Sequence, residues 1–190
     1  MADDRHLSVR HYDASGARSV AAQVIVPIYE ASHAEVIAHP FYSTVRFLER
    51  FDAYTQRDGF ELVVASAGDD DQPVGLAFGY TLPPTTRWWE GLVTPVPDGF
   101  TDEDGTRTFG FNELMVHPDW QRKGVARALH DALLGGRSER RATLLVRADN
   151  TPAQTAYLRW GWQKVAQLQP FPDAPVFDAM IWTRPARSGS

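Results

Sequence analysis

The chain has 190 residues, no cysteine and a formal net charge of −5 at pH 7. Its length fits one domain with a full hydrophobic core, which we expect over residues 1–184, before a disordered tail at 185–190. The absence of cysteine excludes disulfides, thiolate metal sites and a cysteine nucleophile. The acidic balance argues against a nucleic-acid partner, because phosphate contacts need a basic surface. Without a run of about 20 apolar residues or a secretory leader, we expect a cytoplasmic protein that does not engage a membrane.

The N-terminal part is predicted to form a strand followed by two helices. Residues 6–13 alternate in the manner of a strand. From Val20 to Ile28 apolar residues recur at helical spacing, and we expect Pro27 to kink or end that helix. A second helix is predicted near residues 41–56, with one apolar side. The residues of that side are Val45, Phe47, Leu48, Phe51 and Tyr54.

A hairpin and a long loop are predicted next. Residues 60–80 contain two β-rich runs around a turn of one glycine and three aspartates. The run 82–107 is rich in proline and has no sustained period, so we expect a loop, and long loops in compact domains are commonly functional. Trp88 and Trp89 in this loop either line a ligand site or belong to the core. The acidic residues 102–104 either attract a cationic ligand or form a solvated face.

The C-terminal part contains four predicted strands and two predicted helices. The first helix, from Val125, has the apolar spacing of a half-buried helix and ends at a glycine pair. The second begins with a capping box at Thr151, with proline in the first helical position, and ends at Gly161. The strands are predicted at residues 108–116, 144–146, 163–168 and 179–183.

The segment Gln121-Arg122-Lys123-Gly124-Val125-Ala126 is predicted to bind an anion. It lies where a strand and a turn meet the first turn of a helix, whose backbone N–H groups have no partners within the helix. Gly124 lets a ligand approach the backbone, while Arg122 and Lys123 add positive charge. Positive charge at a helix N-terminus opposes the helix dipole, so a bound anion explains these residues better than solvation does. The segment matches neither a Walker loop nor a Rossmann glycine pattern.

The pattern Gln121-x-x-Gly124-x-Ala126 resembles the pyrophosphate loop of the GNAT superfamily, the acyl-CoA-dependent N-acetyltransferases. A strand ending ELMV precedes it and a helix follows it. Further on, LLVRADNTPAQTAYLRWGWQKV is similar to the family's fifth strand, its asparagine-containing loop and the helix that ends in Tyr-x-x-x-Gly-aromatic. The resemblance covers essentially the whole chain. It implies the α/β GNAT fold, with a mixed, mostly antiparallel sheet of six to seven strands, splayed between strands four and five and flanked by about four helices.

The resemblance also implies an activity. Family members use acetyl-CoA as a cosubstrate, so we expect an N-acetyltransferase that acts on a primary amine of a small molecule, by direct attack in a ternary complex. Two alternatives remain open: a non-catalytic module that senses acyl-CoA, and an acetyltransferase of protein N-termini. The expected partners are acetyl-CoA and a small amine, and a homodimer is implied by family likeness. No metal site is expected, since His117 and His130 have no ligand pattern.

Two residues lie at the family's catalytic positions. Glu113 corresponds to a general base that takes the proton of the amine, directly or through water. It can instead anchor a cationic substrate or be satisfied by hydrogen bonds within the strand. Tyr157 corresponds to the acid that protonates the departing thiolate, and its alternative is a packing role.

The remaining residues of the implied site belong to the cofactor. The backbone of Leu114, Met115 and Val116 is expected to pair with pantetheine amides beside a β-bulge, and residues 121–126 are expected to hold the pyrophosphate. Two polar side chains can reach the cofactor from the opposite wall. These are Asn150, with a turn residue as its alternative, and Gln154, with the partner in the capping box as its alternative.

Overall fold

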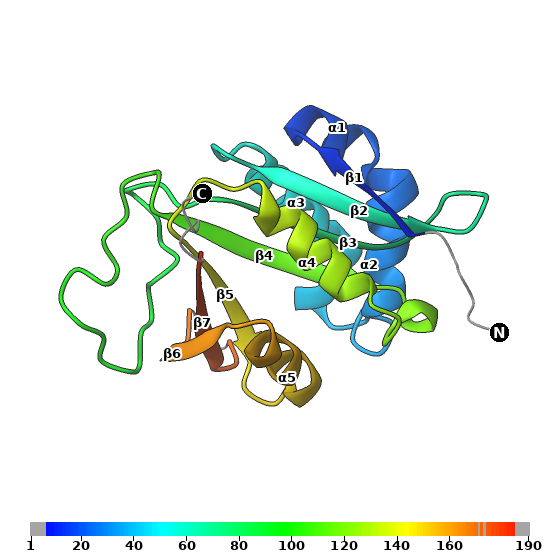
Figure 1. The fold of residues 1–190 in the computed structure, drawn as a ribbon. Coiled ribbons are helices and arrows are strands. Elements are labelled where there is room, and N and C mark those ends of the chain that lie inside the picture. Colours follow the sequence, from blue (N-terminus) through cyan, green and yellow to red (C-terminus); the bar gives the residue numbers. More distant parts are fainter. Residues whose placement is uncertain (1–6, 171, 173, 185–190) are drawn as a thin grey trace. The chain divides into compact units, whose positions relative to one another are not determined.

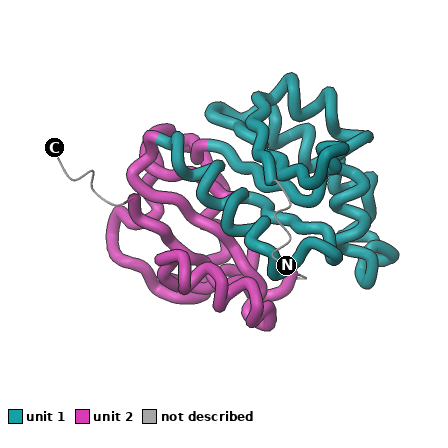
Figure 2. Tube along the Cα trace, turned by 45° about the vertical axis from the view of Figure 1, so that its right-hand side comes forward, with its two compact units in different colours: residues 1–80, 112–137 teal, residues 81–111, 138–190 magenta. Residues whose placement is uncertain are grey.

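The computed structural model describes residues 7–170, 172 and 174–184, so the predicted disordered tail at 185–190 lies outside the described residues. The chain divides into two compact units (Figure 2). Unit 1 comprises residues 1–80 and 112–137, and unit 2 comprises residues 81–111 and 138–190. In the part of the chain described, no helix is long and apolar enough to cross a membrane.

The strands form one sheet in the order β1-β2-β3-β4-β5-β7-β6 (Figure 1). Their bounds are β1 Leu7–Tyr12, β2 Glu61–Ala67, β3 Gln72–Thr81, β4 Thr108–Val116, β5 Arg141–Arg147, β6 Gln163–Leu168 and β7 Phe177–Thr183. The pairs β1–β2, β2–β3, β5–β7 and β6–β7 are antiparallel, whereas β4 and β5 are parallel. The mixed, mostly antiparallel sheet is therefore as predicted. The opening between strands four and five stays a prediction.

The structure describes five α-helices, where about four were expected (Figure 1). They are α1 Ala14–Ser19, α2 Val26–Ser32, α3 Thr44–Thr55, α4 Val125–Gly135 and α5 Thr151–Arg159, with a π-helical stretch at Ala21–Ile25 and 3-10 turns at Pro40–Tyr42 and Pro118–Trp120. In unit 1, α4 packs against β1 and β2. Helices α1 to α3 contribute to the main buried cluster of unit 1.

The first helical region differs from its prediction in two respects. It begins at Ala14 rather than near Val20, because the Asp13 side chain accepts a hydrogen bond from the backbone of Gly16 (2.8 Å) and caps α1. Pro27 does not end the helical path, since it lies in the first turn of α2, where the N–H that it lacks is not needed. The distortion precedes it, as the wider turn of the π-helical stretch.

The apolar side of α3 is confirmed for the aromatic residues and wrong for Val45. Phe47 and Phe51 are each 2% exposed, and Tyr54 packs against the same cluster. Val45 is 67% exposed. It lies two residues before Phe47, and a helix turns by about 100° per residue, so the two side chains point to opposite sides.

The long loop of unit 2 is confirmed as irregular, but it is held firmly along the edge of β6. Gln169 donates its backbone N–H to the carbonyl of Gly91 (2.8 Å), and Val93 donates to the carbonyl of Gln167 (3.0 Å). A side chain at position 91 would collide with the backbone oxygen of Gln169, 2.1 Å from its Cβ, so a glycine is required there. Trp89 packs with Leu168 in a second buried cluster, which favours the core alternative for this tryptophan.

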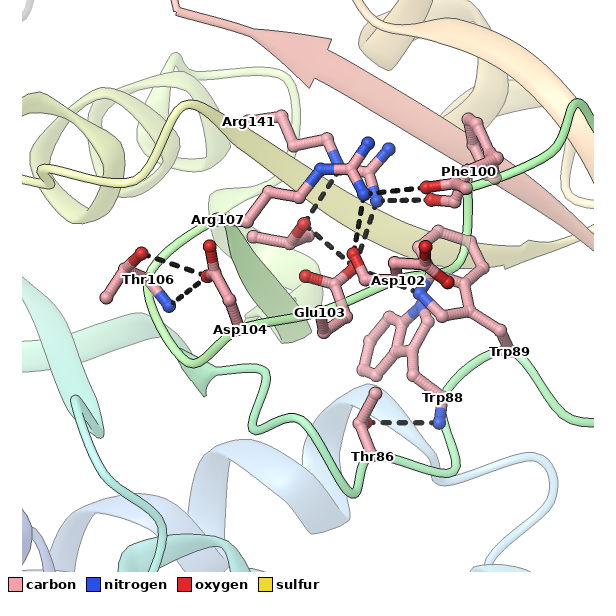
Figure 3. Close-up of polar contacts among 12 residues, drawn as sticks. Thr86, Trp88, Trp89, Phe100, Asp102, Glu103, Asp104, Thr106, Arg107 and Arg141 are labelled. Atoms are coloured by element: carbon pink, nitrogen blue, oxygen red, sulfur yellow. Dashed lines mark hydrogen bonds and ion pairs between the residues drawn. The ribbon is translucent and has the colours of Figure 1, made fainter.

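Glu103 anchors the loop through a buried ion pair, which contradicts both alternatives considered for that residue (Figure 3). Its side chain is 0% exposed, and Oε1 accepts hydrogen bonds from Trp89 Nε1 (3.1 Å), Thr108 Oγ1 (2.9 Å) and Arg141 (2.9 Å). The Arg141 guanidinium also lies 4.8 Å from the ring centroid of Phe100. The charge is compensated at Oε1, where several donors and an opposite charge replace the lost water, whereas Oε2 is buried without a hydrogen-bond partner among the described residues.

Candidate active site

Glu113 lies on the part of β4 that belongs to unit 1. No hydrogen bond or ion pair to its carboxylate occurs among the residues that the structure describes. Burial raises the pKa of Glu113 to about 7, and the positive charge of Arg50 opposes that rise. A carboxyl group with a pKa near neutral can accept a proton at neutral pH and return it afterwards.

The side-chain alternation of β4 is broken next to Glu113. Asn112 hydrogen-bonds to the hydroxyl groups of Tyr54 and Tyr80, and Met115 lies in the buried cluster that Tyr54 and Tyr80 also contact. In a regular strand, residues three apart face opposite sides. A Cβ at Gly75 on the neighbouring strand would lie 2.9 Å from the carbonyl oxygen of Met115, so only glycine fits beside this part of β4. The β-bulge expected at this position stays a prediction.

The charge of the Glu113 carboxylate acts on two tyrosine side chains, Tyr29 and Tyr54. Burial and, to a lesser extent, the negative charge of Glu113 raise the pKa of Tyr54 to about 12. The rings of Tyr54 and Tyr80 stack with centroids 5.7 Å apart. Tyr29 stacks on Phe47 (3.8 Å) and donates its hydroxyl to the backbone oxygen of Tyr42 (2.9 Å). We call Tyr29, Arg50, Tyr54, Tyr80, Asn112 and Glu113 the Glu113 cluster.

Sequence reasoning found one member of the Glu113 cluster and missed the other five. Arg50 left a signal in the pattern, since it lies three residues after Phe47 and four before Tyr54 on α3. This spacing puts a positive charge beside the apolar side of the helix. The sequence signal of Asn112 is weaker. It is a polar residue on β4 that follows two buried positions and directly precedes Glu113. The contact between α3 and β4 follows only from the fold.

The predicted anion loop, residues 121–126, lies in unit 1 and has the backbone that such a site needs. Gly124 caps α4 in the left-handed region, at a φ of 84°, and Arg122 is also left-handed at 61°. Nothing lies within 4 Å of a Cβ built at Gly124, so its conformation rather than space requires glycine. A left-handed residue other than glycine costs about 1 kcal/mol or more and is concentrated at ligand sites.

The side chains of the loop are exposed from Gln121 to Gly124, whereas Val125 is buried and Ala126 half-buried. Lys123 places its Nζ 5.0 Å from the ring centroid of Trp120, which holds the positive charge beside the loop. The first turn of α4 has no side-chain cap, so its backbone N–H groups can donate to an anion, and binding of a diphosphate there stays a prediction. Leu114, Met115 and Val116 lead into this loop from the end of β4. Their pairing with pantetheine stays a prediction.

The start of α5 corrects the predicted capping box. Asn150, not Thr151, caps the helix, because its side chain accepts a hydrogen bond from the backbone of Ala153 (3.3 Å). Asparagine is the better N-cap, and Thr151 is drawn into the first turn instead. Gln154 donates through Nε2 to the backbone oxygens of Arg147 (3.1 Å) and Ala148 (2.9 Å), instead of bonding back to the cap as a capping box requires. Cofactor contacts of Asn150 and Gln154 stay a prediction.

Tyr157 lies in unit 2 and is half-buried. Its ring meets Trp160 edge-on at 5.6 Å and Trp162 at 5.8 Å. Trp162 in turn packs against Phe111, and both are buried. These contacts account for a packing role, and the acid role stays a prediction.

The histidines considered in the sequence have local partners. His117 Nδ1 accepts a hydrogen bond from the backbone of Asp119 (3.3 Å), and the Nδ1 of buried His130 lies 2.8 Å from Asp131. Within the described ranges, no group of three histidine, aspartate or glutamate side chains is placed to hold a metal ion.

Comparisons with known proteins identify the family. Residues 25–162 match the model of the Acetyltransferase (GNAT) family. No curated protein sequence matches the chain. Similar solved structures include an acetyltransferase from Thermus thermophilus, which is 13% identical with a TM-score of 0.63 over 94% of this chain and 97% of that chain.

Two further structures share the fold. A PaiA N-acetyltransferase from Thermoplasma acidophilum in complex with coenzyme A is 10% identical, with a TM-score of 0.56 over 94% of this chain and 99% of that chain. A spermidine N-acetyltransferase chimera from Vibrio cholerae and hSSAT is 16% identical, with a TM-score of 0.59 over 93% of this chain and 95% of that chain. These likenesses confirm the GNAT fold. Because the family model spans most of the sequence, the chain belongs to the acetyltransferase (GNAT) family.

Proposed function

We propose that the chain is an N-acetyltransferase that transfers an acetyl group from acetyl-CoA to a primary amine of a small molecule. The proposal rests mainly on the carboxylate of Glu113, which has no hydrogen-bond partner among the described residues. Its pKa of about 7 makes it a base at neutral pH. A carboxylate with a purely structural role would have donors around it.

The amine is protonated in solution and becomes a nucleophile once Glu113 takes its proton, directly or through water. The amine nitrogen then attacks the carbonyl carbon of the thioester in a ternary complex. The C–S bond breaks and the departing thiolate takes a proton from Tyr157. The nitrogen loses its second proton as the neutral amide forms, and that proton passes through water to restore the Tyr157 hydroxyl. No acyl-enzyme is needed, in keeping with a chain that has no cysteine.

The cofactor would be held mainly by unit 1. The N–H groups of residues 121–126 would donate to its diphosphate, with charge from Arg122 and Lys123. The backbone of Leu114 to Val116 would pair with the pantetheine amides, and Asn150 and Gln154 are the further side chains proposed for cofactor contacts. The coenzyme A complex of the PaiA relative supports acetyl-CoA as the cosubstrate.

A non-catalytic acyl-CoA sensor is the second candidate. It is favoured by Tyr157, whose ring contacts with Trp160 and Trp162 are sufficient to explain its position. Such a module would keep the anion loop and need no base at position 113.

The test is thiol release from acetyl-CoA with a panel of polyamines, aminoglycosides, amino acids and N-terminal peptides. The proposal expects release with one class of small amine, and loss of that release in Glu113→Gln. Coenzyme A binding without release for any amine would favour the sensor. Release only with peptides would favour the acetyltransferase of protein N-termini.

A further inference from the structure

Arg50 gives the candidate site a positive charge that removal of a proton from an amine does not require. It lies on α3 beside the side of the helix that carries Phe47, Phe51 and Tyr54, which contribute to the main buried cluster of unit 1. Arginine is seldom fully buried unless its charge is paired, and the charge of Arg50 acts on Glu113.

The guanidinium is held within the Glu113 cluster. It hydrogen-bonds to the hydroxyl of Tyr29, which is fixed in turn by the backbone oxygen of Tyr42 (2.9 Å). Its charge acts on Glu113 and on Tyr54. The cluster therefore contains one negative and one positive group.

Asn112 adds an unused acceptor to the same cluster. Its side-chain amide hydrogen-bonds to the hydroxyls of Tyr54 and Tyr80. Its Oδ1 is buried, without a hydrogen-bond partner among the described residues. A buried acceptor of this kind is commonly satisfied by a donor that arrives with a ligand.

Resting on the proposed function, we propose that the acceptor is an amino acid or a similar molecule with a carboxylate close to its amine. Arg50 receives the carboxylate, and Glu113 with Asn112 Oδ1 receives the amine. A guanidinium fork matches a carboxylate in both charge and geometry. A polyamine would bring a second positive charge next to Arg50, so acceptors like that of the spermidine N-acetyltransferase relative are disfavoured here.

Matched pairs of acceptors test this proposal. Each amino acid is compared with the amine left after decarboxylation, tyrosine with tyramine and lysine with cadaverine, with spermidine included. We expect kcat/KM to be at least about tenfold higher for the amino acid of the preferred pair. In Arg50→Gln that preference is expected to vanish, mainly through KM, while Arg50→Lys keeps part of it. Arg46→Gln, which removes an exposed charge from the same helix, is the matched control and should keep the preference.

Each outcome decides one claim. Equal use of both members of every pair, or a preference that Arg50→Gln leaves intact, overturns the carboxylate proposal while the N-acetyltransferase stands. If the wild-type protein releases no thiol with any acceptor, the proposed function fails instead. Calorimetry with the amino acids then decides the role of Arg50: binding that is lost in Arg50→Gln but kept in Arg46→Gln supports it, and binding that is absent or unaffected overturns it.

Discussion

Each unit of the molecule contains a glutamate and an arginine that influence one another, and the two pairs are arranged in opposite ways. In unit 2, Glu103 is fully buried, accepts three hydrogen bonds through Oε1 and contacts Arg141 at 2.9 Å. In unit 1, Glu113 has no hydrogen bond among the described residues and is influenced by the charge of Arg50. A carboxylate whose donors are supplied by the fold fixes a loop, whereas one left without donors can act on a ligand.

The largest expected effect is on the stability of unit 2. Glu103→Gln should lower the free energy of unfolding by about 3–5 kcal/mol, because Arg141 is then buried without a counter-charge. Urea unfolding measures the loss. The control is Glu90→Gln, which removes an exposed partner of Arg87 from the same loop and should change stability by less than about 1 kcal/mol. Equal effects of the two variants would mean that Glu103 is not a structural anchor.

The same replacement in unit 1 should affect turnover instead. Glu113→Gln is expected to lower kcat by about 10² or more with the preferred amine, because the ammonium then has no base, while the affinity for coenzyme A stays the same. In the wild type, kcat/KM should rise with pH through a pKa near 7. Turnover within about threefold of wild type would remove Glu113 from the chemistry.

Glu113→Gln should also change how stability depends on pH. The pKa of Glu113 is about 7 in the folded protein, above its ordinary value of 4.5. Between these values the folded state binds more protons than the unfolded state, so the wild type loses stability as pH rises from about 4.5 to 7. Glutamine does not titrate. The free energy of unfolding of the variant minus that of the wild type should therefore be about 2–3 kcal/mol larger at pH 8 than at pH 4.5.

Urea unfolding of both proteins at the two pH values measures this difference, and the subtraction removes the titration of all other groups. A difference between wild type and variant that is the same at both pH values would show that the Glu113 carboxylate is well solvated. The contrast with Glu103 would then rest on hydrogen bonding alone.

Sequence reasoning succeeded where a structure depends on neighbouring residues. The hairpin at 60–80 and the strand at 108–116 follow from local patterns, and both were predicted correctly. It failed where a distant partner decides. The residues next to Glu103 in the sequence do not indicate that it pairs with Arg141. Glu103 was therefore interpreted as part of an acidic surface. Arg50 was missed although its spacing on α3 leaves a local signal, because Tyr29 and Glu113, with which it interacts, are distant in the sequence.

The anion loop gives a smaller effect, on cofactor affinity. Gly124→Asp should weaken coenzyme A binding at least tenfold, about 1.4 kcal/mol, because a carboxylate faces the diphosphate. Gly124→Asn is the matched control, since asparagine and aspartate both tolerate the left-handed region and only one is charged. Calorimetry that finds equal affinities for the two variants would locate the diphosphate elsewhere.

Tyr157 tests the contrast between the units, because a catalytic role would place a catalytic residue in unit 2 as well. Tyr157→Phe keeps the ring against Trp160 and Trp162, so the melting temperature and the affinity for coenzyme A should hold. Only the hydroxyl is lost, and with it the acid for the departing thiolate. A phenol and a thiol have similar pKa values, so the loss is felt in the transition state.

Turnover of Tyr157→Phe should fall by about tenfold, toward the low end for a lost acid, because a thiolate can also take its proton from water. Tyr157→Ala separates packing from chemistry, since it should lower the melting temperature as well. If Tyr157→Phe keeps its turnover while Tyr157→Ala is unstable, the tyrosine only packs. Catalysis would then depend on the Glu113 cluster of unit 1.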